Sequence, residues 1–200
     1  MVPACRAARF SFWAGALFIF TAAAQMGCSR PVIGQESPTL ELRSASFSGN
    51  DIPKISTCDG QDTSPELSWK SPPGRTRSFA LIVIDNNSRF GSVVGAVLHW
   101  VLGYFVHWVM YDLPAEKREL PEGVAKLGQL PDGSRQGQND FDKTGYGGPC
   151  PPGNSSHRYV FTLYALDTKL NLPSGASKDQ VLKAINGHVL ATGELVGHYH

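Results

Sequence analysis

The stretch "GYGGPCPPGNSSHRYVFTLYALD", Gly145 to Asp167, joins a stiff loop to a buried strand. Glycines in its first half let the backbone approach other groups closely, and prolines fix φ. Its second half, residues 158–167, is rich in apolar and aromatic side chains and predicts a β-strand. His157 stands where the loop meets the strand. An ionisable side chain in that position, beside a rigid loop, indicates a binding site.

The remaining chain predicts a mainly β protein. The stretch "SFALIVID", residues 78–85, is almost wholly apolar and predicts a central strand buried on both faces. Further predicted strands cover residues 39–47, 107–113 and 189–199. Residues 51–69 are rich in turn-forming residues, and residues 114–145 predict a long polar loop with a short strand. The strands do not alternate regularly with helices, which argues against a parallel sheet.

One helix is predicted near the C-terminus, over residues 177–187. Ser177 and Gln180 have the spacing of a capping box, in which each side chain accepts a hydrogen bond from the other residue's backbone N–H. Gly187 stands where such a helix ends, since glycine readily adopts the left-handed conformation that terminates helices.

Residues 91–111, "GSVVGAVLHWVLGYFVHWVMY", contain no Asp, Glu, Lys or Arg and are long enough to span a membrane by hydropathy alone. Their Val, Trp, Tyr and Phe residues favour a strand instead. We predict soluble β-structure here because the polar segments on both sides belong to one domain. An alternative is that this apolar segment contacts a partner protein or the bilayer.

The N-terminus predicts export. Arg6 and Arg9 precede the uncharged apolar run Phe10 to Ala24, which is typical of a secretory signal peptide and too short to span a bilayer comfortably. Cleavage has two alternatives. One is ordinary cleavage near Ala24, and the other is lipoprotein processing before Cys28.

The sequence "QMGC" before and including Cys28 resembles a bacterial lipobox, except that Gln25 stands where Leu is usual. We therefore expect a signal peptide of lipoprotein type at residues 1–27, a linker at residues 28–38 and one domain at residues 39–200. Lipidation of Cys28 would anchor the protein to a membrane, and the expected location is the periplasm or a membrane of a bacterium.

The net charge argues against one class of partner, and the cysteine positions limit the possible disulfides and metal sites. The chain carries a formal net charge of +1, so a nucleic-acid partner is not expected. Cys58 and Cys150 remain once Cys5 leaves with the signal peptide and Cys28 is lipidated. In an oxidising compartment they form one disulfide or stay as two buried thiols. No Cys-x-x-Cys spacing indicates a thiolate metal site.

Three ionisable side chains stand at the edges of predicted strands: Asp85, His107 and His157. Protonated imidazoles donate to anions from both ring nitrogens, and a carboxylate would hold one of them oriented. The amides of Gly145, Gly147 and Gly148 would add donors around a phosphate or carboxylate. Alternatively, the histidines are ordinary core residues in a structural corner.

No Gly-x-Ser-x-Gly motif or Cys–His spacing provides an activated nucleophile, so an enzyme is not expected. One catalytic alternative stays open. Asp85, His107 and His157 are a carboxylate and two imidazoles, which together make a common open metal site for a metal-dependent hydrolase. The expected binding protein, in contrast, needs no cofactor or metal.

Five segments in this order resemble the phosphatidylethanolamine-binding protein family, and most closely its bacterial Raf-kinase-inhibitor-like branch. They are "CDGQDTSPELSW", "SFALIVID", "HWVMYDLPA", "GYGGPCPPG…HRYVFTLYALD" and "GHVLATGELVGHY", and they cover about residues 39–199. The resemblance implies a β-sandwich of two antiparallel sheets with a few peripheral helices. It also implies a small pocket for phosphate-like anions or phospholipid head groups.

By motif position, the resemblance assigns the pocket to Asp85, His107, His157, Tyr159, Gly148 and Pro149. It also implies that Cys58 and Cys150 lie close together across the pocket rim. Relatives are described as modulators or inhibitors of kinases or proteases, which implies a protein partner of that kind. An exported chain, however, would not meet a soluble cytoplasmic kinase.

Two departures from the family pattern stand out. "DNNSR" replaces the usual Asp-Pro-Asp-Ala-Pro, so Asn87 stands in place of the second acid. Residues 88–103 are an insertion that contains His99 in a second "HWV". We assign the pocket histidine to His107 because "MYDLPA" follows it, as in the family.

Overall fold

The computed structural model describes residues 39–47, 49–86, 104–153 and 155–200. The predicted signal peptide, linker, Cys28, Asn87 and the 88–103 insertion with His99 lie outside the described residues. The described residues belong to one compact unit.

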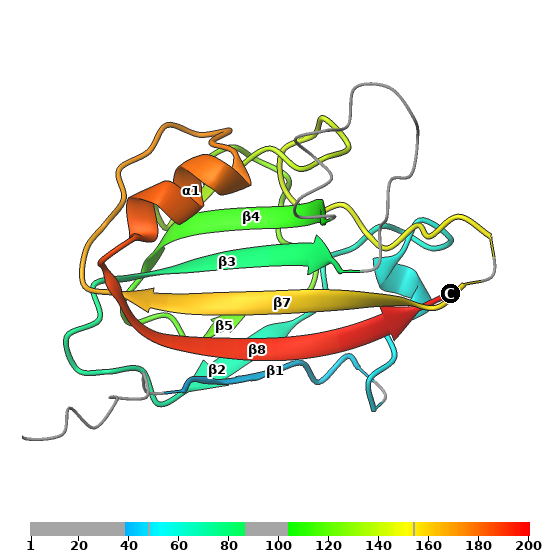
Figure 1. Ribbon diagram of the computed structural model, residues 1–200, viewed down its shortest axis with the longest axis horizontal. Coiled ribbons are helices and arrows are strands. Elements are labelled where there is room, and N and C mark those ends of the chain that lie inside the picture. The colour runs from blue at the N-terminus through cyan, green and yellow to red at the C-terminus, as the bar shows by residue number, and fades with distance from the viewer. Residues whose placement is uncertain (1–38, 48, 87–103, 154) are drawn as a thin grey trace, which may run out of the picture. The chain divides into compact units, whose positions relative to one another are not determined.

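The described strands form two antiparallel sheets (Figure 1). The large sheet has the order β6-β4-β3-β7-β8, with β6 Arg135–Gln136, β4 Phe105–Pro114, β3 Ser78–Asp85, β7 His157–Leu166 and β8 Val189–Tyr199. The small sheet has the order β1-β2-β5, with β1 Glu41–Arg43, β2 Leu67–Lys70 and β5 Glu119–Leu120. A 3₁₀ helix, η1, covers Lys54–Ser56, and α1 covers Lys178–Ile185. The predicted mainly β fold with two antiparallel sheets and a helix near the C-terminus is confirmed.

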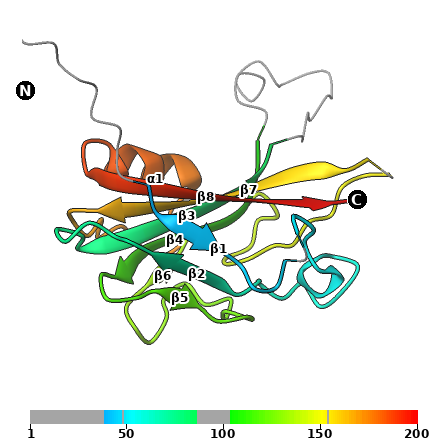
Figure 2. The ribbon, with the colours of Figure 1, turned by 90° about the horizontal axis from the view of Figure 1, so that it is seen from below.

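Both faces of the large sheet are covered (Figure 2). The small sheet packs on one face and α1 on the other. Along β3, Phe79, Leu81 and Val83 enter the core between the sheets, whereas Ala80 and Ile82 face α1. Alternate residues of a strand point to opposite faces, and this explains why the β3 sequence is apolar at nearly every position.

The helix α1 begins as predicted. Oγ of Ser177 accepts from the Gln180 N–H at 3.3 Å, and Oε1 of Gln180 accepts from the Ser177 N–H at 2.9 Å. Val181 and Ile185, one turn apart, are buried against the large sheet. Among the described residues, no helix is long and apolar enough to cross a membrane. The described part of the ambiguous apolar segment begins at Tyr104, and from Phe105 onward it is strand β4.

Two expectations were wrong. The turn-rich segment 51–69 contains the start of β2, and residues 114–145 hold two short strands, β5 and β6, where one was expected. β2 has only Leu67 and Trp69 pointing into the core, and β5 and β6 are two residues each. Such short runs do not contain enough alternation for sequence periodicity to identify them.

Candidate functional site

Strand register brings Asp85, Tyr159 and His157 together at one end of the large sheet. β3 ends at Asp85, which is paired with Tyr159 on the antiparallel strand β7. His157 precedes Tyr159 by two residues and so lies on the same face of β7. Asp85 likewise continues the face of Val83, toward the core between the sheets. In Figure 1, β3 and β8 end where β7 begins.

A β-bulge places His107 in the same group. Val83 pairs with Trp108 and Ile84 pairs with Val106, so His107 lies between them without an opposite residue on β3. A bulge re-aims the side chains beside it and is common next to functional sites. Here it turns the imidazole toward β7.

Tyr159 lies between the two histidines. Its ring meets His107 edge to face at 5.1 Å between centroids and stacks on His157 at 6.5 Å. The structure therefore brings four of the predicted residues together: Asp85, His107, His157 and Tyr159.

His157 is oriented by Asp85. The two side chains are buried, and Nδ1 of His157 donates to Oδ2 of Asp85 at 2.6 Å. Because an ionised carboxylate only accepts hydrogen bonds, Nδ1 carries the hydrogen. The other ring nitrogen, Nε2, lies 3.2 Å from Oγ of Ser155, which is exposed. Asp85 thus holds one histidine in a fixed orientation.

His107 is held differently. Its Nδ1 lies 2.7 Å from the carbonyl oxygen of Gly147, and the Gly147 N–H donates back to the His107 carbonyl at 2.9 Å. The ring centroids of Phe105 and Phe141 lie 5.1 and 5.4 Å from the centroid of the His107 ring. Burial lowers the pKa of His107, and this outweighs hydrogen bonding to Gly147 and the nearby Asp85 charge. His107 is therefore neutral near pH 7, unlike the protonated imidazole that the sequence suggested.

The hydroxyl of Tyr159 has no hydrogen-bond partner among the described residues. The side chain is 1% exposed, and its Oη is one of four fully buried polar side-chain atoms in the described part of the chain without a partner. Burial raises the pKa of Tyr159, so the hydroxyl keeps its hydrogen and is a donor. Buried polar groups are nearly always paired, so this hydroxyl calls for an acceptor from outside the chain.

The glycine loop does not present its amides to the site as the sequence suggested. The N–H groups of Gly145 and Gly147 donate to the carbonyls of Gly137 and His107, and that of Gly148 donates to Oδ1 of Asp62 at 2.5 Å. Buried backbone donors require partners, and these three find them inside the protein.

Gly148 and Pro149 support the site instead of donating to a ligand. A Cβ atom at Gly148 would lie 2.4 Å from the Ser56 carbonyl oxygen, so only glycine fits there. The Pro149 carbonyl accepts from the Cys58 N–H at 3.0 Å.

A disulfide joins Cys58 to Cys150. The same two loops are also fastened by a hydrogen bond from the Tyr146 hydroxyl to the Ser56 carbonyl at 2.7 Å. Together with the Asp62 bond to Gly148, these contacts fix the loop that carries the Gly147 carbonyl.

Asp62, Tyr146 and Tyr199 were missed from the sequence. Tyr199 pairs with His157 across β8 and β7, and its hydroxyl donates to Oδ2 of Asp59 at 2.7 Å. Asp62 lies in the turn-rich segment, where its position among turn residues gave the only signal of a loop-fixing role.

No observation favours the metal-dependent hydrolase alternative. Among the described residues, no three His, Cys, Asp or Glu side chains are placed to hold a metal ion. Asp85 and His157 bond directly to each other, and Nδ1 of His107 is engaged by a carbonyl.

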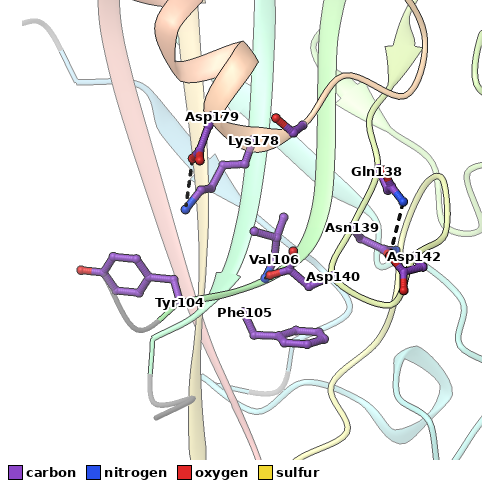
Figure 3. Close-up of a pocket in the computed structure, with 10 residues that line it drawn as sticks. Tyr104, Phe105, Val106, Gln138, Asn139, Asp140, Asp142, Lys178 and Asp179 are labelled. Atoms are coloured by element: carbon purple, nitrogen blue, oxygen red, sulfur yellow. Dashed lines mark hydrogen bonds and ion pairs between the residues drawn. The ribbon is translucent and has the colours of Figure 1, made fainter. Parts of the chain in front are cut away.

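A cavity of about 460 Å³ lies elsewhere, between the start of α1, the start of β4 and the 138–142 loop (Figure 3). Tyr104, Asp140 and Lys178 are among its lining residues, and none of the four grouped site residues lines it. Its one buried polar side chain among the described lining residues, Asn139, bonds to Gly145, Phe141 and Lys143. The cavity therefore offers no orphaned group that asks for a ligand.

Comparison with known proteins finds a matching family model and similar proteins. A family model described as "Phosphatidylethanolamine-binding protein" matches residues 43–200. A UPF0098 protein of Methanothermobacter thermautotrophicus is 47% identical over 148 residues, covering 74% of this chain and 89% of the relative. A UPF0098 protein of Aquifex aeolicus is 43% identical over 163 residues, covering 80% and 88%.

Two solved structures are similar in fold and sequence. YbcL of Escherichia coli, described as a new member of the mammalian PEBP family, has a TM-score of 0.69 at 31% identity and covers 80% of this chain and 98% of its own. The putative PEBP homologue CT736 of Chlamydia trachomatis has a TM-score of 0.68 at 38% identity and covers 82% and 99%.

Proposed function

This chain belongs to the phosphatidylethanolamine-binding protein family, and on that premise we propose that Asp85, His107, Tyr159 and His157 bind a phosphate-like anion. The observation that carries this proposal is the Tyr159 hydroxyl, buried without a partner between two histidines. A phosphate oxygen is a strong acceptor and would satisfy it.

The His157–Asp85 pair supports the same function. Asp85 fixes the hydrogen on Nδ1 and leaves Nε2 of His157 directed at the exposed Ser155 hydroxyl. Water can replace Nε2 as the hydrogen-bond partner of this exposed Ser155 hydroxyl. A ligand oxygen can therefore take the place of the hydroxyl beside Nε2. His157 would then contact the anion through Nε2, and Asp85 would hold the imidazole in that orientation.

We propose binding and not catalysis. Ser155, His157 and Asp85 are linked in the order nucleophile, base and orienting acid, but a serine nucleophile also needs donors for the developing oxyanion. The loop amides of Gly147 and Gly148, which the sequence suggested as donors to a ligand, are both engaged internally. No observation in the described part of the chain points specifically to a kinase or protease partner, so the proposal stops at the ligand.

We further propose that the protein is exported, and the Cys58–Cys150 disulfide supports this because such bonds persist in oxidising compartments. Fractionation of cells tests it. The full chain is expected in the periplasmic or membrane fraction, and a Cys28→Ser variant is expected to leave the membrane fraction if Cys28 carries the lipid. Cytoplasmic recovery of both would contradict export.

Calorimetric titration of the purified protein tests anion binding. After metal analysis, phosphate and phosphoethanolamine are expected to bind, and ethanolamine, which lacks the phosphate, is not. Binding that appears only after zinc or manganese is added would instead support the metal site. Equal binding of ethanolamine and phosphoethanolamine would show that the phosphate is not what the protein recognises.

A further inference from the structure

The hydrogen-bonding pattern of His107 fixes what a ligand must bring to it. A carbonyl oxygen only accepts, so Nδ1 of His107 carries the hydrogen in its 2.7 Å bond to Gly147. The Gly147 carbonyl is held in this orientation. Its N–H is bonded back to His107, and a Cβ at this position would lie 2.5 Å from the Phe141 ring, which packs against it.

In a neutral imidazole with the hydrogen on Nδ1, Nε2 is a hydrogen-bond acceptor. No described residue donates to it. The groups that could change its protonation are Asp85 on β3, Asp140 in the loop after β6, and Tyr159 and His157 on β7. The two carboxylates favour the protonated ring, but burial among Phe105 and Phe141 outweighs them and keeps it neutral.

The site therefore combines an acceptor, Nε2 of His107, with a donor, the Tyr159 hydroxyl. A phosphate oxygen without a hydrogen can accept from the Tyr159 hydroxyl. Opposite Nε2 of His107, however, its lone pairs would face the lone pair of that nitrogen. A P–OH group suits His107. Both requirements are met by a monoprotonated phosphate monoester, which has hydroxyl and unprotonated oxygens on the same phosphorus.

We propose that this site selects phosphate monoesters over phosphodiesters and sulfate esters, because the ligand must donate a hydrogen to Nε2 of His107. This inference rests on the proposed anion-binding function and names its ligand class. The second pKa of a phosphate monoester is about 6, so about a tenth of the monoester carries this hydrogen at pH 7. Diesters and sulfate esters carry no such hydrogen. The ligand would be a phosphorylated small molecule or a lipid with a terminal monoester, in preference to an intact diester head group.

Three ligands that share the ethanolamine group separate these classes. Phosphoethanolamine is a monoester, glycerophosphoethanolamine is the diester of a lipid head group, and ethanolamine O-sulfate is the sulfate ester. In calorimetry of the purified protein at pH 7.0, we expect the monoester to bind at least tenfold more tightly than either of the others. Affinities within threefold of one another would overturn the inference and leave anion binding intact. No binding of any of the three would overturn the proposed function itself.

His107→Gln tests the residue that imposes the selection. The glutamine amide can present either its N–H or its oxygen, so the preference for the monoester is expected to fall below threefold. The matched control is His188→Gln, since His188 also bonds an oxygen through Nδ1, that of the Asp167 carboxylate, but is exposed and directly precedes β8, at the opposite end of the sheet from the site. The control is expected to keep the tenfold preference. A tenfold preference that survives in folded His107→Gln would contradict the assignment.

A pH series on the unmodified protein keeps the inference testable if His107→Gln does not fold. Ethanolamine O-sulfate has no group that titrates near neutrality, so it binds well only when His107 itself takes up a proton. Its affinity is expected to rise up to tenfold as the pH falls by one unit, from 7.5 to 6.5. An affinity that does not change across this range would contradict the proposal.

Discussion

Replacing His157 by alanine is expected to weaken phosphoethanolamine binding at least 100-fold, which corresponds to about 2.7 kcal/mol. The substitution removes the Nε2 contact to the ligand and also the buried hydrogen bond to Asp85. The carboxylate then keeps its negative charge beside the anion without the imidazole that offsets it. Calorimetry under the conditions used for the unmodified protein measures the loss.

The chain offers a matched control for this prediction. His188 forms the same kind of bond, from Nδ1 to Oδ1 of Asp167 at 2.8 Å, but both side chains are exposed. His188→Ala is expected to bind phosphoethanolamine as the unmodified protein does. If His157→Ala folds normally and loses less than threefold in affinity, His157 does not contact the anion.

Removing the disulfide is expected to lower the free energy of unfolding by about 4 kcal/mol. Cys58 and Cys150 are 92 residues apart in sequence, so the bond closes a long loop and strongly restricts the unfolded chain. Urea titration of the double variant Cys58→Ser, Cys150→Ser against the unmodified protein, without reductant, measures the difference.

Reductant provides the control for the disulfide. It is expected to destabilise the unmodified protein and to leave the double variant unchanged. A difference below 1 kcal/mol between the two proteins, or two free thiols in aerobically purified protein, would contradict the structural role of the bond. Such a result would also remove the support that the disulfide gives to export.

Sequence patterns identified the long strands well. The apolar run 78–85 and the run 189–199 coincide with β3 and β8, because extended strands in a covered sheet require many consecutive β-favouring residues. The sequence did not predict β2, because its two inward residues, Leu67 and Trp69, stand at the end of a turn-rich segment. Its pairing with β1 and β5 is a long-range property that no local window contains.

The grouping of the site followed partly from sequence. Asp85 and His157 stand at the ends of two predicted strands, so their meeting needed only that these strands pair antiparallel, as β3 and β7 do. The orientation of His107 could not be predicted, because it depends on a bulge between β3 and β4. Its neutral state depends on burial by Phe105 and Phe141, which come from separate segments.

The loop from Gly145 to Pro149 shows why composition alone misleads. The glycine content predicts amides presented to a ligand, whereas Gly148 is required because a Cβ atom there would lie 2.4 Å from the Ser56 carbonyl oxygen. The amide of Gly148 is bonded by Asp62, a residue 86 positions away in sequence. Residue patterns alone left open whether Cys58 and Cys150 form a disulfide, because this depends on how closely the two loops approach each other. The signal peptide and Cys28 lie outside the described residues, so their roles stay predictions.

Nitrogen NMR of the histidine side chains tests the central claim most directly. During titration of the purified, isotope-labelled protein with phosphoethanolamine, the ring nitrogens of His107 and His157 are expected to shift together and to saturate at the calorimetric affinity. The ring nitrogens of His188, which lies outside the site, are expected to stay unchanged. Saturable shifts at His188 with none at His107 and His157 would show that the anion binds elsewhere and would contradict the account.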